Sequence, residues 1–329
     1  MNYAIFAHQF EPMKRDIEIL INKSEITAGT RGSSLGPEAV MTAARKRESH
    51  YFSKFPIHHV QHMNHLLDTT VKFPYAKRIE GLVHVFQSVS SNVKALLDAQ
   101  KFPLIIASDH GSAGGTIAGV KAAHPNKRLG VVWIDAHGDL HTPYTTPSGN
   151  MHGMPLATAL GEDNVECKIN EIGEEEKRMW NLLKSTGIDG PKILPEDLVF
   201  ISVRDTELPE NKMIERLNIT NHTVDQIRES GKEEILRKTR DQLKNCEIIY
   251  VSFDVDSMDP KETSHGTGTP VDHGLSTAEA TYFMTELAKW DKLVCMEFVE
   301  VNPCLDEKIN KMAEVTFDVL EATTIELEK

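Results

Sequence analysis

Cysteine, basic residues and long apolar runs are all scarce in this sequence. Only four cysteines occur among 329 residues, and none forms a CxxC pair, so no disulfide framework is expected. The 36 lysines and arginines are outnumbered by 49 aspartates and glutamates, which gives a net charge of −13. An acidic chain repels phosphate backbones, which argues against a nucleic-acid partner and favours the approach of a cationic substrate.

Segments typical of membrane insertion or secretion are also lacking. No stretch approaches the roughly 18 apolar residues of a membrane helix. Residues 1–8 lack the basic start and longer apolar run of a signal peptide, so we expect a cytoplasmic protein with no membrane partner. Hydrophobic residues make up 40% of the chain, and no linker or repeat is evident. A single domain over residues 1–329 is the simplest interpretation.

Short apolar runs alternate with amphipathic stretches along the chain. Buried strands are predicted over residues 104–107, 131–134, 198–203, 248–253 and 293–299. Helices are predicted over residues 116–123, 213–217, 233–243 and 277–290. The alternation predicts an α/β fold with a doubly wound, mainly parallel sheet. We interpret the acidic segment 162–184 as a surface insertion with a short helix.

Polar side chains follow each predicted strand. In chain order these residues are Asp109 and His110, then Asp135, His137 and Asp139, then Arg204 and Asp205, then Asp254 and Asp256, and finally Glu300. In an open parallel sheet, ligands bind beyond the carboxyl ends of the strands. We therefore expect these residues to converge on one edge of the sheet.

Six of these residues are of the types that bind metal ions. They are His110, Asp135, His137, Asp139, Asp254 and Asp256. An isolated DxHxD or DxD motif is a weak signal, because aspartate also caps turns, but here three clusters occupy matching positions. Four adjacent carboxylates would repel one another strongly, and two divalent cations would cancel their charge. An oxygen-rich set with two imidazoles and no thiolate suits Mn²⁺ better than structural Zn²⁺.

At these residues the sequence resembles the arginase family of ureohydrolases. The matching segments are 29–37, 108–110, 135–139, 252–260, 266–270 and 300–303. The resemblance implies a three-layer α/β/α fold, two Mn²⁺ ions and a homo-oligomer, either a trimer or a hexamer. It also implies that one ion takes His110, Asp135, Asp139 and Asp254, and that the other takes Asp135, His137, Asp254 and Asp256.

The segment after Asp139 is similar to the arginase loop, whereas agmatinase-like and formimidoylglutamase-like members usually differ there. The resemblance implies that His141, Ser148 and Asn150 hold the α-carboxylate of the substrate and that Glu207 meets its α-amino group. The chain departs from the family at three positions, with His141 for Asn, Glu207 for Asp and Gly111 for Ser. These departures leave the predicted metal ligands intact and bear on substrate choice.

The expected reaction is the Mn²⁺-dependent hydrolysis of L-arginine to L-ornithine and urea, with a hydroxide between the metal ions as the nucleophile. Asp139 would accept a hydrogen bond from the nucleophile, Glu300 would hold the guanidinium group, and His152 would pass a proton to the leaving amine. Simpler alternatives are a turn cap for Glu300, an ordinary loop position for His152, an exposed position for His141, and an ion pair between Arg204 and Asp205.

Two other functions compete with an arginase. One is a ureohydrolase that acts on agmatine, guanidinobutyrate or formimidoylglutamate. The other is a metal-binding protein without catalytic activity, which the complete set of six ligand-type residues disfavours. The loop from His141 to His152 is the feature that distinguishes the ureohydrolases from one another.

Overall fold

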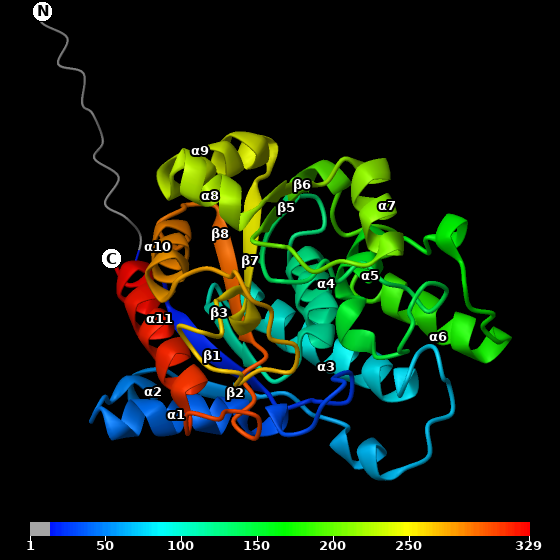
Figure 1. The fold of residues 1–329 in the computed structure, drawn as a ribbon, viewed down its shortest axis with the longest axis horizontal. Helices are drawn as coiled ribbons and strands as arrows, with labels where there is room; N and C mark the ends of the chain where they lie inside the picture. The colour runs from blue at the N-terminus through cyan, green and yellow to red at the C-terminus, as the bar shows by residue number, and fades with distance from the viewer. Residues whose placement is uncertain (1–13) are drawn as a thin grey trace, which may run out of the picture.

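An eight-stranded sheet forms the centre of the computed structural model, which describes residues 14–329. Its strands are β1 (Ile17–Asn22), β2 (Ile57–His59), β3 (Phe102–Ala107), β4 (Leu129–Ile134), β5 (Leu198–Ile201), β6 (Thr220–His222), β7 (Ile248–Asp254) and β8 (Leu293–Val299). The strand order is β2-β1-β3-β8-β7-β4-β5-β6, and every neighbouring pair is parallel (Figure 1). The predicted parallel α/β sheet is therefore confirmed.

Helices cover both faces of the sheet (Figure 1). They are α1 (Gly36–Lys46), α2 (Tyr51–Lys54), α3 (Ile79–Asp98), α4 (Ala113–Ala123), α5 (Pro155–Leu160), α6 (Glu174–Ser185), α7 (Leu208–Leu217), α8 (Val224–Ser230), α9 (Lys232–Gln242), α10 (Thr277–Ala288) and α11 (Lys311–Leu327). Side chains of α1 and α8 to α11 share one apolar core with the sheet, and those of α3 to α7 share a second core. Along β3, Leu104 and Ile106 enter the first core, whereas Ile105 enters the second. This alternation builds the expected α/β/α layers.

Two sequence predictions differ from the structure in detail. Strand β5 ends at Ile201, two residues earlier than expected, because Ser202 adopts a left-handed backbone with φ 72°. The interpretation of residues 162–184 as a surface insertion is wrong in part. Helix α6 buries Met179, Trp180 and Leu183, and Trp180 is fully enclosed. These three positions form an apolar stripe within an otherwise acidic sequence.

The strand order determines which loops meet at the carboxyl edge. Strands β8 and β7 lie between β3 and β4, so the segments that follow these four central strands are brought together. The segments that carry the predicted metal ligands follow β3, β4 and β7. Within residues 14–329, no helix combines the length and apolar character needed to cross a bilayer. The prediction about residues 1–8 lies outside the described residues, and the single domain over residues 1–329 stays a prediction.

Candidate metal centre

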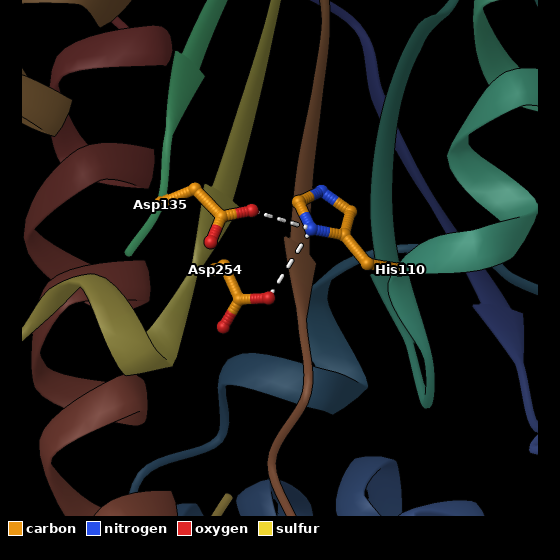
Figure 2. A group of neighbouring side chains, drawn as sticks. All are labelled: His110, Asp135 and Asp254. Carbon is orange, nitrogen blue, oxygen red and sulfur yellow. Dashed lines mark ion pairs between the residues drawn. The ribbon is translucent and has the colours of Figure 1, made fainter. Parts of the chain in front are cut away.

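The first group of ligand-type side chains surrounds the imidazole of His110. This residue directly follows β3, at the start of a short 3-10 helix. Its Nδ1 atom lies 3.0 Å from Asp135 Oδ2 and 3.1 Å from Asp254 Oδ2 (Figure 2). It also lies 3.3 Å from Asp139 Oδ2. Although Nδ1 is buried, it has no hydrogen bond of acceptable geometry within the described chain. A buried imidazole nitrogen that faces three carboxylate oxygens in this way is suited to share a cation with them.

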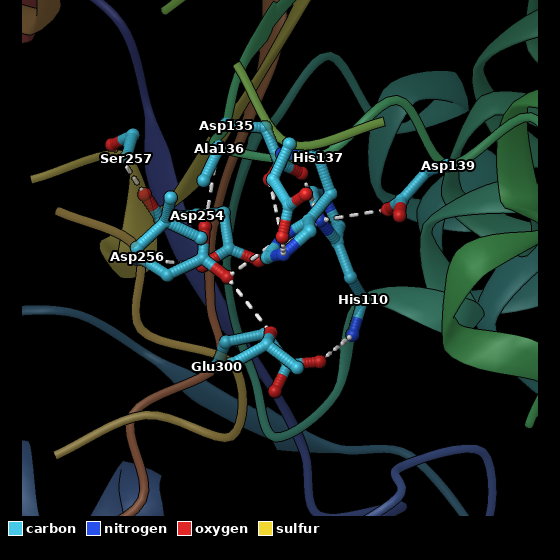
Figure 3. Close-up of polar contacts among 12 residues, drawn as sticks. His110, Asp135, Ala136, His137, Asp139, Asp254, Asp256, Ser257 and Glu300 are labelled. Atoms are coloured by element: carbon cyan, nitrogen blue, oxygen red, sulfur yellow. Dashed lines mark hydrogen bonds and ion pairs between the residues drawn. The ribbon is translucent and has the colours of Figure 1, made fainter. Parts of the chain in front are cut away.

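A second group forms around His137, two residues beyond Asp135. Its Nδ1 atom lies 3.1 Å from Asp256 Oδ2 and 3.5 Å from Asp135 Oδ1 (Figure 3). Asp135 therefore belongs to both groups, since its Oδ2 atom faces His110 and its Oδ1 atom faces His137. A carboxylate with one oxygen in each of two adjacent cation sites is suited to bridge two metal ions.

Asp135, which directly follows β4, and Asp254, which ends β7, are also held by the backbone. Asp135 Oδ1 accepts a hydrogen bond of 2.7 Å from His137 N, and Asp254 Oδ1 accepts one of 2.8 Å from Asp256 N. Asp139 and Glu300 both adopt left-handed backbones, with φ values of 51° and 71°. Such conformations cost energy for residues with a side chain, and they often occur at functional sites.

The tryptophan before the second ligand segment supports both groups. The indole of Trp133 stacks on the imidazole of His110, with ring centroids 4.0 Å apart and an interplanar angle of 4°. Its Nε1 atom donates a hydrogen bond of 2.9 Å to Asp135 Oδ2. On the other side of the imidazole, His110 Nε2 lies 2.7 Å from the hydroxyl of Ser252. Contacts of this kind fix the orientation of metal-binding side chains.

The buried carboxylates of the site repel one another. Burial and the charge of Asp135 raise the pKa of Asp139 well above its usual value. Burial and the charges of Asp256 and Asp135 do the same to the pKa of Asp254. Burial alone would lower the pKa of His110, but the contacts with Asp135 and Asp254 raise it. Positive charge is therefore favoured between these side chains, and the donor set fits divalent cations.

Glu300 follows β8 and lies beside the first group. Its Oε1 atom accepts a hydrogen bond of 2.8 Å from the backbone nitrogen of His110 (Figure 3). Burial and the nearby carboxylate of Asp109 raise the pKa of Glu300 to about 8. The Oε2 atom lies on the side of Gly268, 3.7 Å from the position that a β-carbon on this glycine would occupy. A buried carboxylate next to the metal ligands can pair with a planar cation.

The loop after Asp139 forms one side of the candidate site. His152 is partly buried, and its backbone nitrogen donates to Thr27 O over 3.3 Å. Burial, together with the charges of His137 and His110, lowers the pKa of His152 to about 4. Its ring is therefore neutral near pH 7 and can accept a proton.

The predicted substrate-binding residues divide into two pairs. His141 is buried, so the alternative of an exposed residue is wrong, and its Nε2 atom lies 3.5 Å from carboxylate oxygens of Glu207 and Glu210. Glu207 caps the N-terminus of α7 and is exposed. Ser148 is exposed, and its hydroxyl accepts a hydrogen bond of 3.2 Å from the backbone nitrogen of Asn150. The structure thus brings His141 to Glu207 and Ser148 to Asn150.

Arg204 does not form the ion pair with Asp205 that was one interpretation of the sequence. Its guanidinium group donates to five backbone carbonyl groups, those of Ser202, Asp256, Ser257, Val271 and Asp272. No ion pair joins Arg204 to Asp205 in the described part of the chain, and Asp205 is exposed. The alternative of an Arg204–Asp205 ion pair is therefore wrong. Arg204 instead holds the segment that carries Asp256 against the loop 271–272.

Sequence reasoning missed three side chains that shape the site, namely Trp133, Ser252 and Glu210. Each lies close in sequence to a predicted site residue. Trp133 and Ser252 precede Asp135 and Asp254 by two positions, so they point to the same side of their strands. That period-two relation was the signal that could have found them. Glu210 forms a capping box with Glu207, a signal that the pattern Glu207-Leu-Pro-Glu210 carries.

The fold and the site together define a class of protein, the α/β/α proteins with a carboxylate and imidazole cluster at the carboxyl edge of a parallel sheet. Comparison with known proteins shows which family within this class the chain belongs to. The model of the arginase family matches residues 16–325, and the chain belongs to this family. It is accordingly a ureohydrolase-type enzyme, which acts on the C–N bonds of guanidino groups.

Individual relatives agree with the family match. The arginase of Bacillus subtilis (strain 168) is 32% identical over 315 residues, which cover 94% of this chain and 98% of the relative. The crystal structure of Entamoeba histolytica arginase in complex with L-ornithine matches with a TM-score of 0.80 at 26% identity, and covers 94% of this chain and 99% of that one. A formimidoylglutamase from Bacillus subtilis shares the fold, with a TM-score of 0.72 at 17% identity and coverage of 95% and 87%.

Proposed function

We propose that this protein hydrolyses L-arginine to L-ornithine and urea and that it uses two Mn²⁺ ions. The observation that carries the proposal is the pair of ligand groups that share Asp135, in a chain of the arginase family. When bound, the ions would supply an activated water at neutral pH. The substrate is supported by the similarity to the Entamoeba histolytica arginase that was solved with L-ornithine.

The metal ions would be held by the six residues found in the sequence, namely His110, Asp135, His137, Asp139, Asp254 and Asp256. Oxygen ligands dominate this set, and none of them is a thiolate, which favours Mn²⁺ over structural Zn²⁺. Asp139 lies 3.3 Å from His110 Nδ1 through its Oδ2 atom. Its other oxygen remains a suitable acceptor for the proton of an attacking water.

Glu300 would hold the guanidinium group of the substrate. The hydrogen bond from His110 N fixes the carboxylate next to the ligand groups, and two carboxylate oxygens match the planar donors of a guanidinium. Without metal ions, the pKa of Glu300 is raised to about 8, and nearby cations, including a guanidinium group, would favour its ionised form. His152, with its neutral ring, would take up a proton and deliver it to the leaving amine.

The decisive assay measures urea release after the protein has been loaded with Mn²⁺. We expect the highest kcat/KM with L-arginine, compared with agmatine and guanidinobutyrate as alternative substrates. Activity confined to agmatine would reject the arginase proposal. Metal binding without hydrolysis of any guanidino compound would instead support the alternative of a non-catalytic metal-binding protein.

Replacement His152→Ala should keep the metal content and slow urea release by about 10²-fold or more. Light scattering would test the expected trimer or hexamer.

A further inference from the structure

Lys77 lies beside one of the predicted substrate-binding residues, in a loop that the sequence motifs did not single out. Its Nζ atom donates a hydrogen bond of 3.1 Å to Asn150 Oδ1, and its backbone nitrogen donates one of 2.9 Å to Gly149 O. Gly149 has a φ of 76°, and the carbonyl oxygen of Pro74 occupies the space that a β-carbon would need. The loop before α3 is thus fitted closely to the loop that carries Asn150.

The contact with Lys77 determines which way the amide of Asn150 faces. An ammonium group can only donate hydrogen bonds, so the amide oxygen must face Lys77 and the NH₂ group must face the other way. The Nδ2 atom accordingly lies against Gly29, 2.8 Å from the position of a β-carbon there. The contact with Lys77 therefore leaves the NH₂ donors of Asn150 available, as the binding of a carboxylate requires.

Residues 29–30, which lie beside Asn150, lead to the part of the candidate site that contains Glu300, the residue proposed to hold the guanidinium group. Gly29 is exposed, and the hydroxyl of the next residue, Thr30, lies 3.1 Å from the position of a β-carbon on Gly268. Gly268 in turn lies next to Glu300 Oε2. Residues 29–30 therefore connect the surroundings of Asn150 to those of Glu300, so the two ends of one elongated substrate could be held on either side of this segment.

The surroundings of His141 are acidic. His141, which the family resemblance assigns to the substrate carboxylate, lies 3.5 Å from carboxylate oxygens of both Glu207 and Glu210. These carboxylates would repel a carboxylate on the substrate and attract an ammonium group. The carboxylate of an amino acid is therefore better accommodated at Asn150, near the ammonium group of Lys77, than beside Glu207 and Glu210.

We propose that Lys77 is a specificity-determining residue that recognises the α-carboxylate of the substrate, through its own charge and through the orientation that it imposes on Asn150. The inference rests on the proposed arginase function and adds to it the reason for selectivity. A site with an ammonium group beside Asn150 and carboxylates beside His141 favours a zwitterionic amino acid. A decarboxylated guanidino amine gains nothing from the ammonium group.

The test compares L-arginine with agmatine in Mn²⁺-loaded enzyme. We expect Lys77→Met to raise the KM for L-arginine about tenfold or more, because a charge-assisted hydrogen bond is lost, while kcat changes little. The kcat/KM for agmatine should stay at the wild-type value. Lys77→Arg keeps the charge and should retain most of the selectivity. Lys72→Met is the matched control, because Lys72 is exposed in the same loop, and it should behave as wild type.

Binding of the product gives a second measurement that does not depend on turnover. Calorimetry should show weaker binding of L-ornithine to Lys77→Met and unchanged binding of putrescine. Equal losses for L-arginine and agmatine, or an unchanged ratio between them, would overturn the role of Lys77 while leaving the arginase function intact. Absence of urea release from every substrate with the wild-type protein would instead reject the proposed function. In either case, L-ornithine binding that is unaffected by Lys77→Met would overturn the role of Lys77.

Discussion

Replacement of Trp133 by phenylalanine should weaken metal binding without removing a ligand. Phenylalanine keeps an aromatic ring stacked on the imidazole of His110 and deletes the hydrogen bond of 2.9 Å from Nε1 to Asp135 Oδ2. A hydrogen bond to a charged group contributes about 1.5–3 kcal/mol, and this acceptor belongs to the carboxylate shared by both ligand groups. We therefore expect Mn²⁺ affinity to fall about tenfold to hundredfold.

Calorimetric titration of the metal-free protein with Mn²⁺ measures this change, and urea release at saturating Mn²⁺ should stay near the wild-type rate. Trp180→Phe is the matched control. The indole of Trp180 is also fully buried and donates a hydrogen bond of 2.7 Å to an aspartate, Asp163, but it lies in α6, away from the ligand groups. Both variants should lose stability, and only Trp133→Phe should lose metal affinity. Equal Mn²⁺ affinity in the two variants would refute the reasoning.

Three further predictions concern the same site. Asp256→Asn should remove one Mn²⁺ per chain and most of the urea release, because it neutralises a carboxylate 3.1 Å from His137 Nδ1; unchanged metal content by elemental analysis would contradict its assignment as a ligand. Arg204→Lys should lower the free energy of unfolding by about 2–4 kcal/mol, because an ammonium group cannot serve five carbonyl acceptors; denaturant titration measures the loss, and a change below about 0.5 kcal/mol would contradict this account. The pKa of His152 is lowered to about 4, so the unfolded chain takes up a proton at this residue at higher pH than the folded chain does. The metal-free protein should therefore lose about 3 kcal/mol of its free energy of unfolding through His152 as the pH falls from 6.5 to 4. The variant His152→Asn should lose correspondingly less over this pH range.

The sequence was informative about the central strands because they are buried on both faces. Strands β3, β4, β5, β7 and β8 are mostly apolar and were all predicted. Strands β2 and β6 have three residues each and lie at the two edges of the sheet, so no apolar run marks them. Strand β1 was missed, because its uninterrupted apolar run between Glu18 and Asn22 is only three residues long. Edge strands carry little of the burial on which such predictions depend.

Helices α1, α2, α3, α5, α8 and α11 were missed, although the signal for α3 was present. The buried residues Leu82, Val85, Phe86, Val89 and Val93 recur at spacings of three and four, which is the period of a helix with one buried face. Helix α7 was predicted only from residue 213, whereas it begins at Leu208 after the capping box of Glu207 and Glu210. Here the start was given by polar capping residues rather than by apolar periodicity.

The candidate site was predictable where its residues lie next to strands and less so where loops meet. His110, Asp135 and Asp254 follow buried strands, so the parallel sheet alone brings them to one edge. The contact between Lys77 and Asn150 joins loops that are 73 residues apart and belong to no regular element. Such contacts depend on how loops pack against one another, which apolar periodicity does not encode.

The position of β7 and β8 between β3 and β4 has a consequence for how the protein is made. During synthesis, residues 14–245 can emerge with four of the six ligand-type side chains, yet β3 and β4 have no hydrogen-bonded contact with each other. The gap is closed only when residues 248–299 leave the ribosome and insert as the two innermost strands. With the proposed ligands, metal uptake would therefore be a late event in biogenesis. A nascent chain stalled before residue 248 would expose two unfinished sheet edges and lack two of the six ligand-type side chains.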